Sequence, residues 1–134
     1  MTEDKTKQVI VIRKDLKMGR GKEVSQGSHA SMLFLVNRLN PGLFGLDNRV
    51  HGLFSDEEMD WLKKGRFTKI TVSVDSEQEM LDLFDAAKAA GLTVHRVDDP
   101  GLTEFHGVKT LTAICIGPHR SSLIDPLTKD LKLL

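Results

Sequence analysis

The residue types best suited to chemistry lie between Lys17 and Ala30, in the stretch KMGRGKEVSQGSHA. Its glycines free the backbone to approach a ligand, and the unpaired amides at a helix N-terminus favour an anion. Lys17, Arg20 and Lys22 add positive charge. Neither a P-loop spacing nor a GxGxxG spacing is present, so contact with a phosphate and an ordinary surface loop stay equal alternatives.

Three polar residues of this stretch have the spacing of one helix face. Lys22, Gln26 and His29 stand at i, i+4 and i+7, which brings their side chains to the same side of a helix. A single helical histidine is more often structural than catalytic. The lysine and the amide on the same face make His29 a candidate proton acceptor.

A second candidate is the carboxylate of Asp99, in the sequence Asp98-Asp99-Pro100-Gly101. These residues are typical of a turn, and they also suit a functional carboxylate at the end of a strand. No histidine pair has a zinc spacing and the chain has one cysteine, so we expect no metal site. Cys115 lies in the apolar run LTAICI, which favours a buried hydrophobe over a thiol nucleophile.

The first half of the chain must position these groups. Residues 8–12, QVIVI, are apolar on consecutive positions, which predicts a strand covered on both faces. A polar loop follows, and then a helix over about 22–39 that we expect Asn40-Pro41 to end. Residues 41–54 show no period and are predicted to form a loop.

The second half has clearer local signals. Ser55 with Glu58, and Ser76 with Glu79, form capping boxes that predict two helices ending near Gly65 and Gly91. Strands are predicted over residues 67–74, 92–97 and 109–116, the last ended by Gly117-Pro118, with a short helix near 122–125 and a strand-like or docked terminus at 131–134.

The order β-α-α-β-α-β-β-α predicts an α/β fold: one domain over residues 1–134 with a mixed four-stranded sheet flanked by helices. Residues 1–6 are expected to be a flexible tail.

Charge and hydropathy exclude several classes. The net charge is zero, which argues against a general nucleic-acid coat, although basic residues gather in 5–22 and 63–69. No stretch has the ~18 apolar residues of a membrane span, and none resembles a signal peptide. We therefore expect a cytoplasmic protein with no membrane partner.

Several blocks together resemble the archaeal/eukaryotic-type peptidyl-tRNA hydrolases. These blocks are DLKMGRGK at 15–22, Gln26-x-Ser28-His29-Ala30, AGLTV at 90–94, Asp99-x-Gly101-x-Thr103, Ile116-Gly117-Pro118, LID at 123–125 and LKL at 131–133. They occur in family order over most of the chain. The resemblance implies a mixed four-stranded sheet, no metal or organic cofactor, a homodimer, and hydrolysis of the ester that joins a peptide to its tRNA.

The resemblance also implies the residues of the cleft. The catalytic set is His29, Asp99, Lys17 and Thr103, and the substrate-binding set is Lys22, Gln26, Lys69 and Arg20. In the implied chemistry His29 or Asp99 orients or deprotonates the attacking water. Lys17 or Lys22 stabilises the oxyanion or holds phosphates at the tRNA 3′ end, and Thr103 positions the substrate.

Some positions depart from the family pattern. Ser73 stands where a lysine is common, Glu104 where a glutamine is usual, Pro100 where a small residue is found, and Gly27 where cysteine, alanine or serine is frequent. Residues 105–109 also diverge, and the segment 41–65 is longer than usual. Ser73, Glu104 and the altered loop after it favour one alternative, a non-catalytic module that binds tRNA ends or another anion. A hydrolase for another small ester or amide is a further alternative, because a fold does not determine a function.

Overall fold

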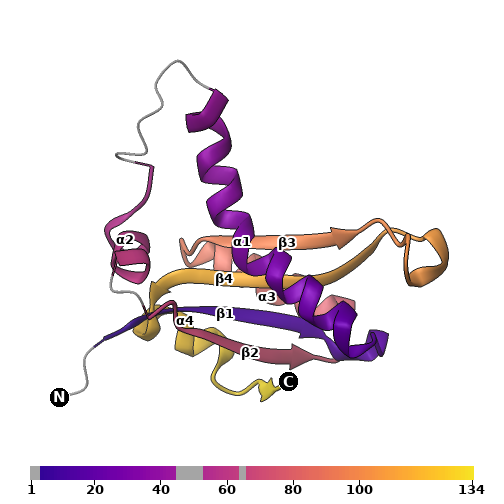
Figure 1. Cartoon of the computed structure of the whole chain (residues 1–134). Coiled ribbons are helices and arrows are strands. Elements are labelled where there is room, and N and C mark those ends of the chain that lie inside the picture. The colour runs from indigo at the N-terminus through magenta and orange to yellow at the C-terminus, as the bar shows by residue number, and fades with distance from the viewer. Residues whose placement is uncertain (1–3, 45–52, 64–65) are drawn as a thin grey trace.

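The computed structural model describes residues 4–44, 53–63 and 66–134 of the chain. One open sheet carries α1 and α2 on one face and α3 and α4 on the other (Figure 1). The elements in chain order are β1 (Thr6–Arg13), the 3-10 turn η1 (Lys14–Leu16), α1 (Arg20–Phe44), α2 (Asp56–Lys63), β2 (Lys69–Val74), α3 (Glu77–Ala89), β3 (Val94–Asp99), the 3-10 turn η2 (Phe105–Gly107), β4 (Thr110–Arg120), α4 (Ser121–Thr128) and β5 (Lys132–Leu133). The predicted α/β class in a single domain is confirmed.

The sheet has five strands in the order β3-β4-β1-β2-β5. β1 pairs parallel with β2 and antiparallel with β4, so the sheet is mixed as predicted. The predicted number of four strands is wrong by one. The C-terminal segment, expected to be strand-like or docked, pairs with β2 as an edge strand: Val72 lies opposite Leu133, and Ser73 opposite Lys132.

The core consists of two clusters, one on each face of the sheet. Val9 and Val11 of β1 pack in the cluster that α3 and α4 cover. Ile10 and Ile12 pack in the cluster that α1 covers, together with Ala30 and neighbouring strand residues. Each of these four strand residues is at most 6% exposed. This alternation explains the uninterrupted apolar run of β1, whose two faces are both covered.

The serine of each predicted capping box caps its helix, while the Glu79 carboxylate accepts from the Asp75 amide in place of the Ser76 amide. Ser76 accepts a hydrogen bond from the Glu79 amide at the start of α3. At the start of α2 the Ser55 hydroxyl accepts from the Glu58 amide, and the Glu58 carboxylate accepts from the Ser55 amide. Both helices begin where their sequence signals place them because each box satisfies otherwise unpaired amides.

Three predicted boundaries are wrong. The helix α1 continues past Asn40-Pro41 to Phe44, since a proline removes one helical hydrogen bond without forbidding the helix. The strand β3 includes Asp98 and Asp99, which pair with β4, so these residues are not a turn. The strand β4 continues through Pro118 to Arg120, with an irregular register opposite β1 where the proline cannot donate. Residues 45–52 of the predicted loop lie outside the described residues.

Candidate functional site

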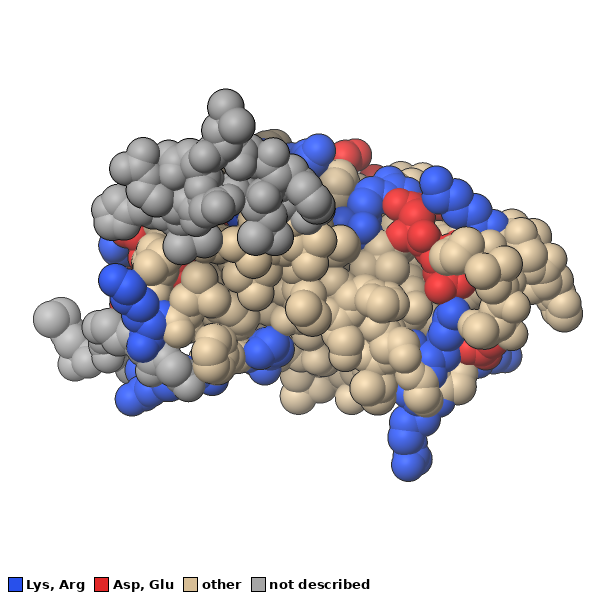
Figure 2. Space-filling view, turned by 45° about the horizontal axis from the view of Figure 1, so that its top comes forward, with Lys and Arg blue, Asp and Glu red and all other residues tan. Residues whose placement is uncertain are grey.

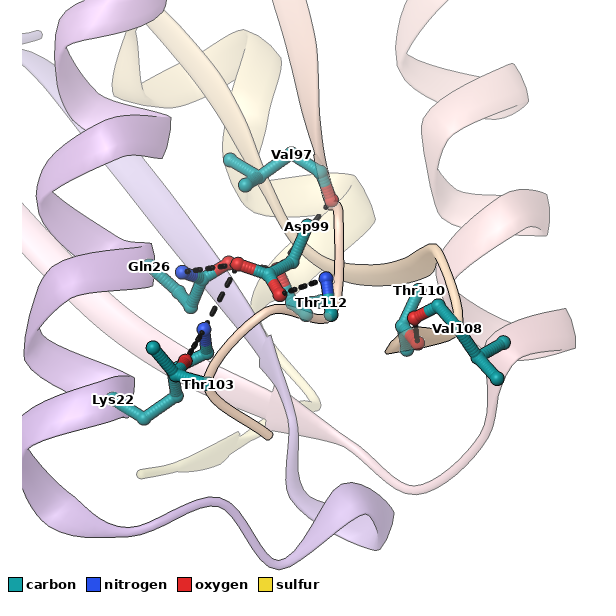
Figure 3. Close-up of polar contacts among 9 residues, drawn as sticks. Lys22, Gln26, Val97, Asp99, Thr103, Val108, Thr110 and Thr112 are labelled. Atoms are coloured by element: carbon teal, nitrogen blue, oxygen red, sulfur yellow. Dashed lines mark hydrogen bonds and ion pairs between the residues drawn. The ribbon is translucent and has the colours of Figure 1, made fainter. Parts of the chain in front are cut away.

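Four of the predicted site residues meet where β3 ends beside the first turns of α1. Lys22 and Gln26 reach from α1 toward Asp99, the last residue of β3, and Thr103 follows in the loop after it (Figure 3). The i, i+4 spacing on a helix face therefore does bring the lysine and the amide together. Asp99 joins them because its strand lies on the same flank of α1.

The ammonium group of Lys22 is at the centre of this cluster. Its Nζ atom lies 2.9 Å from the Asp99 Oδ1 atom and 2.7 Å from the Thr103 Oγ1 atom. The same nitrogen lies 5.7 Å from the centroid of the Phe105 ring. An ammonium group has three N–H donors, and the described residues accept two of them. The third donor is available to an oxygen atom of a substrate.

The orientation of Gln26 is determined by a buried threonine. Thr112 of β4 donates to the Gln26 Oε1 atom at 2.5 Å, so the amide nitrogen of Gln26 points toward the Asp99 Oδ1 atom, 3.4 Å away. Both residues are at most 2% exposed. This pair aligns the carboxylate rather than contacting solvent.

The carboxylate of Asp99 is held in its charged form. Burial of the group raises its pKa, but the hydrogen bonds from Lys22 and from the Gly101 amide, together with the Lys22 charge, outweigh burial and lower the pKa below its ordinary value. The Gly101 amide donates to the Oδ2 atom at 2.8 Å. A carboxylate with a lowered pKa is a good partner for a cation and a weak proton acceptor.

The loop after β3 is shaped by Gly101. Its φ angle is +83°, and a Cβ atom there would lie 2.4 Å from the Val108 carbonyl oxygen. The Gly107 amide donates to the Gly101 carbonyl, which closes the loop. Phe105 and His106 also have positive φ angles, an uncommon conformation for residues with side chains. This closed loop presents Thr103 to Lys22.

Two predicted catalytic residues are outside this network. His29 is exposed on α1, about one helical turn beyond Gln26, and no hydrogen bond or ion pair among the described residues joins it to the cluster. Lys17 follows η1 in a left-handed backbone conformation, with its side chain exposed. Among the described residues, neither side chain has a hydrogen bond or an ion pair to the cluster.

Arg20 and Lys69, expected to bind substrate, lie on the other flank of α1. Both line a groove of about 550 Å³ between α1 and the β2–β5 half of the sheet. They lie at opposite ends of this groove, because Arg20 follows the C-terminal end of β1 and Lys69 pairs with Gln8 near the other end.

Sequence reasoning missed Thr112, the Gly101 amide and Phe105. Thr112 lies in a run of apolar β4 residues, and its polar side chain within a buried strand was the available signal. The hydrogen bond from the Gly101 backbone amide had no corresponding signal in the sequence. Ser73, one of the positions that depart from the family pattern, donates to the Lys132 carbonyl at 3.4 Å and so supports β5. Cys115 is buried as expected, and burial raises the pKa of its thiol.

In the part of the chain that the structure describes, no three side chains of histidine, cysteine, aspartate or glutamate gather as metal ligands. Among the same residues no helix is long and apolar enough to cross a membrane.

Comparison with known proteins identifies close relatives. The family model described as peptidyl-tRNA hydrolase PTH2 matches residues 6–134. A protein named peptidyl-tRNA hydrolase from Methanocaldococcus jannaschii is 37% identical over 96% of this chain and 99% of its own length. A protein of the same name from Methanopyrus kandleri is 40% identical over 96% of this chain and 97% of its own. One from Saccharolobus islandicus is 34% identical over 96% and 98%.

Proposed function

The chain belongs to the peptidyl-tRNA hydrolase PTH2 family and hydrolyses peptidyl-tRNA, and we propose that the Lys22–Asp99–Thr103 cluster performs this reaction. The observation that carries the proposal is the ammonium group of Lys22. It is held between a carboxylate and a hydroxyl, its side chain is 14% exposed, and one of its donors remains for the substrate.

The reaction is the addition of water to the ester carbonyl between the peptide and the tRNA. A negative charge develops on the carbonyl oxygen as the tetrahedral intermediate forms, and a positioned cation stabilises it. The third N–H group of Lys22 supplies this charge. Collapse of the intermediate breaks the bond to the ribose oxygen, which takes a proton, and releases a free tRNA and a peptide carboxylate.

Asp99 acts by holding Lys22 rather than by accepting the proton. Its lowered pKa makes it a weak base, and its oxygen atoms already accept from Lys22, Gln26 and Gly101. In this assignment Gln26 positions Asp99, and Thr103 positions Lys22 and the substrate.

The proton acceptor in this proposal is His29. It is an exposed imidazole on the helix that carries Lys22 and Gln26, and in this assignment it takes the proton of the water that attacks the ester. Lys17, exposed just before α1, is assigned to a phosphate of the tRNA end. The alternative of a non-catalytic binding module receives no support from the comparisons.

The test of the proposed roles is release of peptide from N-acetyl-aminoacyl-tRNA under multiple-turnover conditions. We expect His29→Gln and Lys22→Gln to lower kcat by about 100-fold or more, as loss of a proton acceptor or a charge stabiliser does. His119→Gln is the matched control, because His119 lies at the opposite end of β4. Full activity of His29→Gln would show that the histidine takes no part in the reaction. Full activity of Lys22→Gln would show that the cluster is not the catalytic centre.

We also propose a cytoplasmic location, because peptidyl-tRNA arises at ribosomes, and a homodimer, as the family resemblance implies. Light scattering of the purified protein tests the second of these. A mass of one chain at micromolar concentration would contradict it.

A further inference from the structure

The groove beside α1 is not used by the proposed chemistry. It lies across α1 from the Lys22–Asp99 cluster, since Arg20 and Glu23 line it while the adjacent Lys22 points to Asp99. Figure 2 shows that charged side chains on the visible face gather mainly toward its ends, while a broad middle area is uncharged. The groove therefore offers a separate surface that begins close to the reacting centre.

Ile10 and Ile12 of β1, which are only 6% and 1% exposed, form the floor of the groove with Thr71 of β2. The accessible apolar surface therefore lies on the walls. One wall is the flank of α1, where Val24 and Met32 are 64% and 55% exposed. Leu134 at the C-terminus lines the other side. This surface suits flat or aliphatic groups.

Small residues on α1 keep the groove open. Ser28 and Ser31 line it with short side chains, and Gly27 has none. A Cβ atom at Gly27 would lie 3.8 Å from the Ile10 Cγ2 atom, which is an ordinary contact, so the position tolerates alanine but a longer side chain would fill the groove.

The cationic lining indicates an anionic occupant. Arg20 and Lys69 are both exposed, against one partly buried acid, Glu23. The ammonium of Lys69 is held over the rings of Trp61 and Phe67, at 5.0 and 5.5 Å from their centroids. Phe67 is itself 46% exposed, so an aromatic face lies beside this end of the groove. Cations with adjacent apolar and aromatic surfaces are the pattern that binds single-stranded nucleic acid.

The length of the groove suits a short single strand. From the level of Lys69, which pairs with Gln8, to Ile12 is four strand residues, or about 13 Å. That length holds about three to four nucleotides at the ~3.4 Å spacing of a stacked strand.

We infer that this groove binds the single-stranded 3′ end of the tRNA, with phosphates near Arg20 and Lys69 and bases against the exposed apolar side chains of the walls. The inference rests on the proposed function. The terminal nucleotide leaves the groove at the Arg20 end and crosses the start of α1, where a Cβ atom at Gly19 or Gly21 would meet nothing within 4 Å. The ester then reaches Lys22, and earlier nucleotides run toward Lys69.

The test compares four N-acetyl-aminoacyl esters, on adenosine, on the dinucleotide CA, on the trinucleotide CCA and on full-length tRNA. The wild type should have a lower KM for acyl-CCA than for acyl-adenosine. Arg20→Gln and Lys69→Gln should each raise the KM for acyl-CCA about five- to tenfold, as loss of one exposed charge-assisted contact does. Lys69→Gln should affect CCA more than the dinucleotide CA, because Lys69 is at the far end.

Two further variants separate the groove from general electrostatics. Ser28→Phe leaves the charge unchanged and fills the groove, so it should also remove the preference for acyl-CCA over acyl-adenosine. Lys129→Gln removes an exposed lysine after α4 on the opposite face and should keep that preference. The strand does not lie in the groove if Ser28→Phe retains the preference for acyl-CCA over acyl-adenosine. The same conclusion follows if Arg20→Gln and Lys69→Gln raise the KM for full-length tRNA alone.

Two outcomes identify what has failed. If the variants raise KM in proportion to the length of the peptide on adenosine, the peptide occupies the groove and the inference is wrong. If the wild type hydrolyses no ester, the proposed function fails. Fluorescence anisotropy with a labelled unacylated CCA oligonucleotide then still tests whether the groove binds the strand. Weaker binding by Arg20→Gln and Ser28→Phe would support it, and unchanged binding would overturn it.

Discussion

A lysine that donates to a carboxylate and a hydroxyl at once is fixed in direction as well as in charge. Lys22 meets Asp99 and Thr103 in this way, and Gln26 with Thr112 aligns the carboxylate from behind. The cluster is thus arranged before a substrate arrives, which is the condition under which a charge stabilises a transition state effectively.

At this scale the two adjacent aspartates provide a matched pair. Asp99→Asn removes the charge that holds Lys22, and we expect kcat for peptidyl-tRNA hydrolysis to fall by about 100-fold. Asp98→Asn removes an exposed ion pair with Arg96 at 2.8 Å and should stay within about twofold of the wild type. Equal effects of the two substitutions in a kinetic assay would contradict the assigned role of Asp99.

The lowered pKa of Asp99 predicts a pH dependence of stability. A carboxylate whose pKa is lower in the folded protein contributes stability above its unfolded pKa of about 3.9, and this contribution is lost as the pH falls through the folded pKa. The difference in unfolding free energy between the wild type and Asp99→Asn should therefore be constant at neutral pH and shrink below about pH 4. Urea unfolding at a series of pH values measures it.

The origin of that shift can be tested directly. In Lys22→Gln the carboxylate loses its largest favourable partner while its burial remains, so the pKa of Asp99 should rise. Carbon-13 NMR titration of the aspartate carboxyl groups would follow it, and an unchanged value would show that other contacts determine the pKa.

At the scale of the elements, the loop between β3 and β4 determines where Thr103 lies. Its conformation depends on two glycines with nearly the same positive φ angle, +83° at Gly101 and +77° at Gly107. Only the first has backbone atoms within reach of a side chain. Substitutions at the two positions therefore distinguish the cost of a steric clash from the cost of a left-handed backbone conformation alone.

Gly101→Ala should therefore destabilise the protein more than Gly107→Ala. The second change costs about 1 kcal/mol of left-handed strain, and the first adds a clash with the Val108 carbonyl. Gly101→Ala should also lower hydrolytic activity, since it displaces the amide that binds Asp99 and moves Thr103. Thermal unfolding together with peptide release measures both effects. Equal effects in both variants would contradict the steric argument.

The helix α2 is anchored by one buried carboxylate. Glu58, 1% exposed, accepts from Arg38 of α1 at 2.6 Å and from the Ser55 amide at 2.7 Å. Thr93, just before β3, donates to its other oxygen atom at 3.3 Å. Removing the charge leaves the Arg38 guanidinium without this partner, which destabilises a protein when the site is buried.

Glu58→Gln should lower the free energy of unfolding by about 2 kcal/mol, less than in a fully buried pair because the Arg38 side chain is 34% exposed. Glu57→Gln provides the control, since its ion pair with Arg120 is 3.8 Å long and more exposed, and should cost less than about 1 kcal/mol. Urea unfolding of both variants compares them, and a larger effect of Glu57→Gln would refute the anchor.

At the scale of the whole molecule, a neutral net charge hides an uneven distribution. Basic side chains flank the groove and precede α1, so the proposed RNA site has local positive charge although the chain has equal numbers of basic and acidic residues. Binding of RNA through these residues releases counterions from its phosphates.

The affinity for deacylated tRNA should therefore fall steeply with salt. For a single strand the logarithmic slope is about −0.7 for each phosphate contact, so Arg20→Gln should reduce the slope by about that amount and Lys129→Gln should not. Filter binding between low and physiological salt measures it. A flat response of the wild type would contradict binding by these residues.

Much of this protein follows from local sequence. The helix caps at Ser55 and Ser76, the two-sided run 8–12 and the helix face of Lys22 and Gln26 depend on residues a few positions apart, and the structure has each of them. The same is true of the α/β class, because the order of elements restricts the layers that can form.

What only the tertiary structure decided depends on pairing between distant segments. Asp99 meets Lys22 across 77 positions, and Thr112 meets Gln26 across 86, because β3 and β4 lie under the same end of α1. The fifth strand exists because a two-residue segment finds the edge of β2. Arg20 and Lys22, two positions apart in the sequence, point to opposite flanks of one helix, and the sheet beneath gives each flank a different partner.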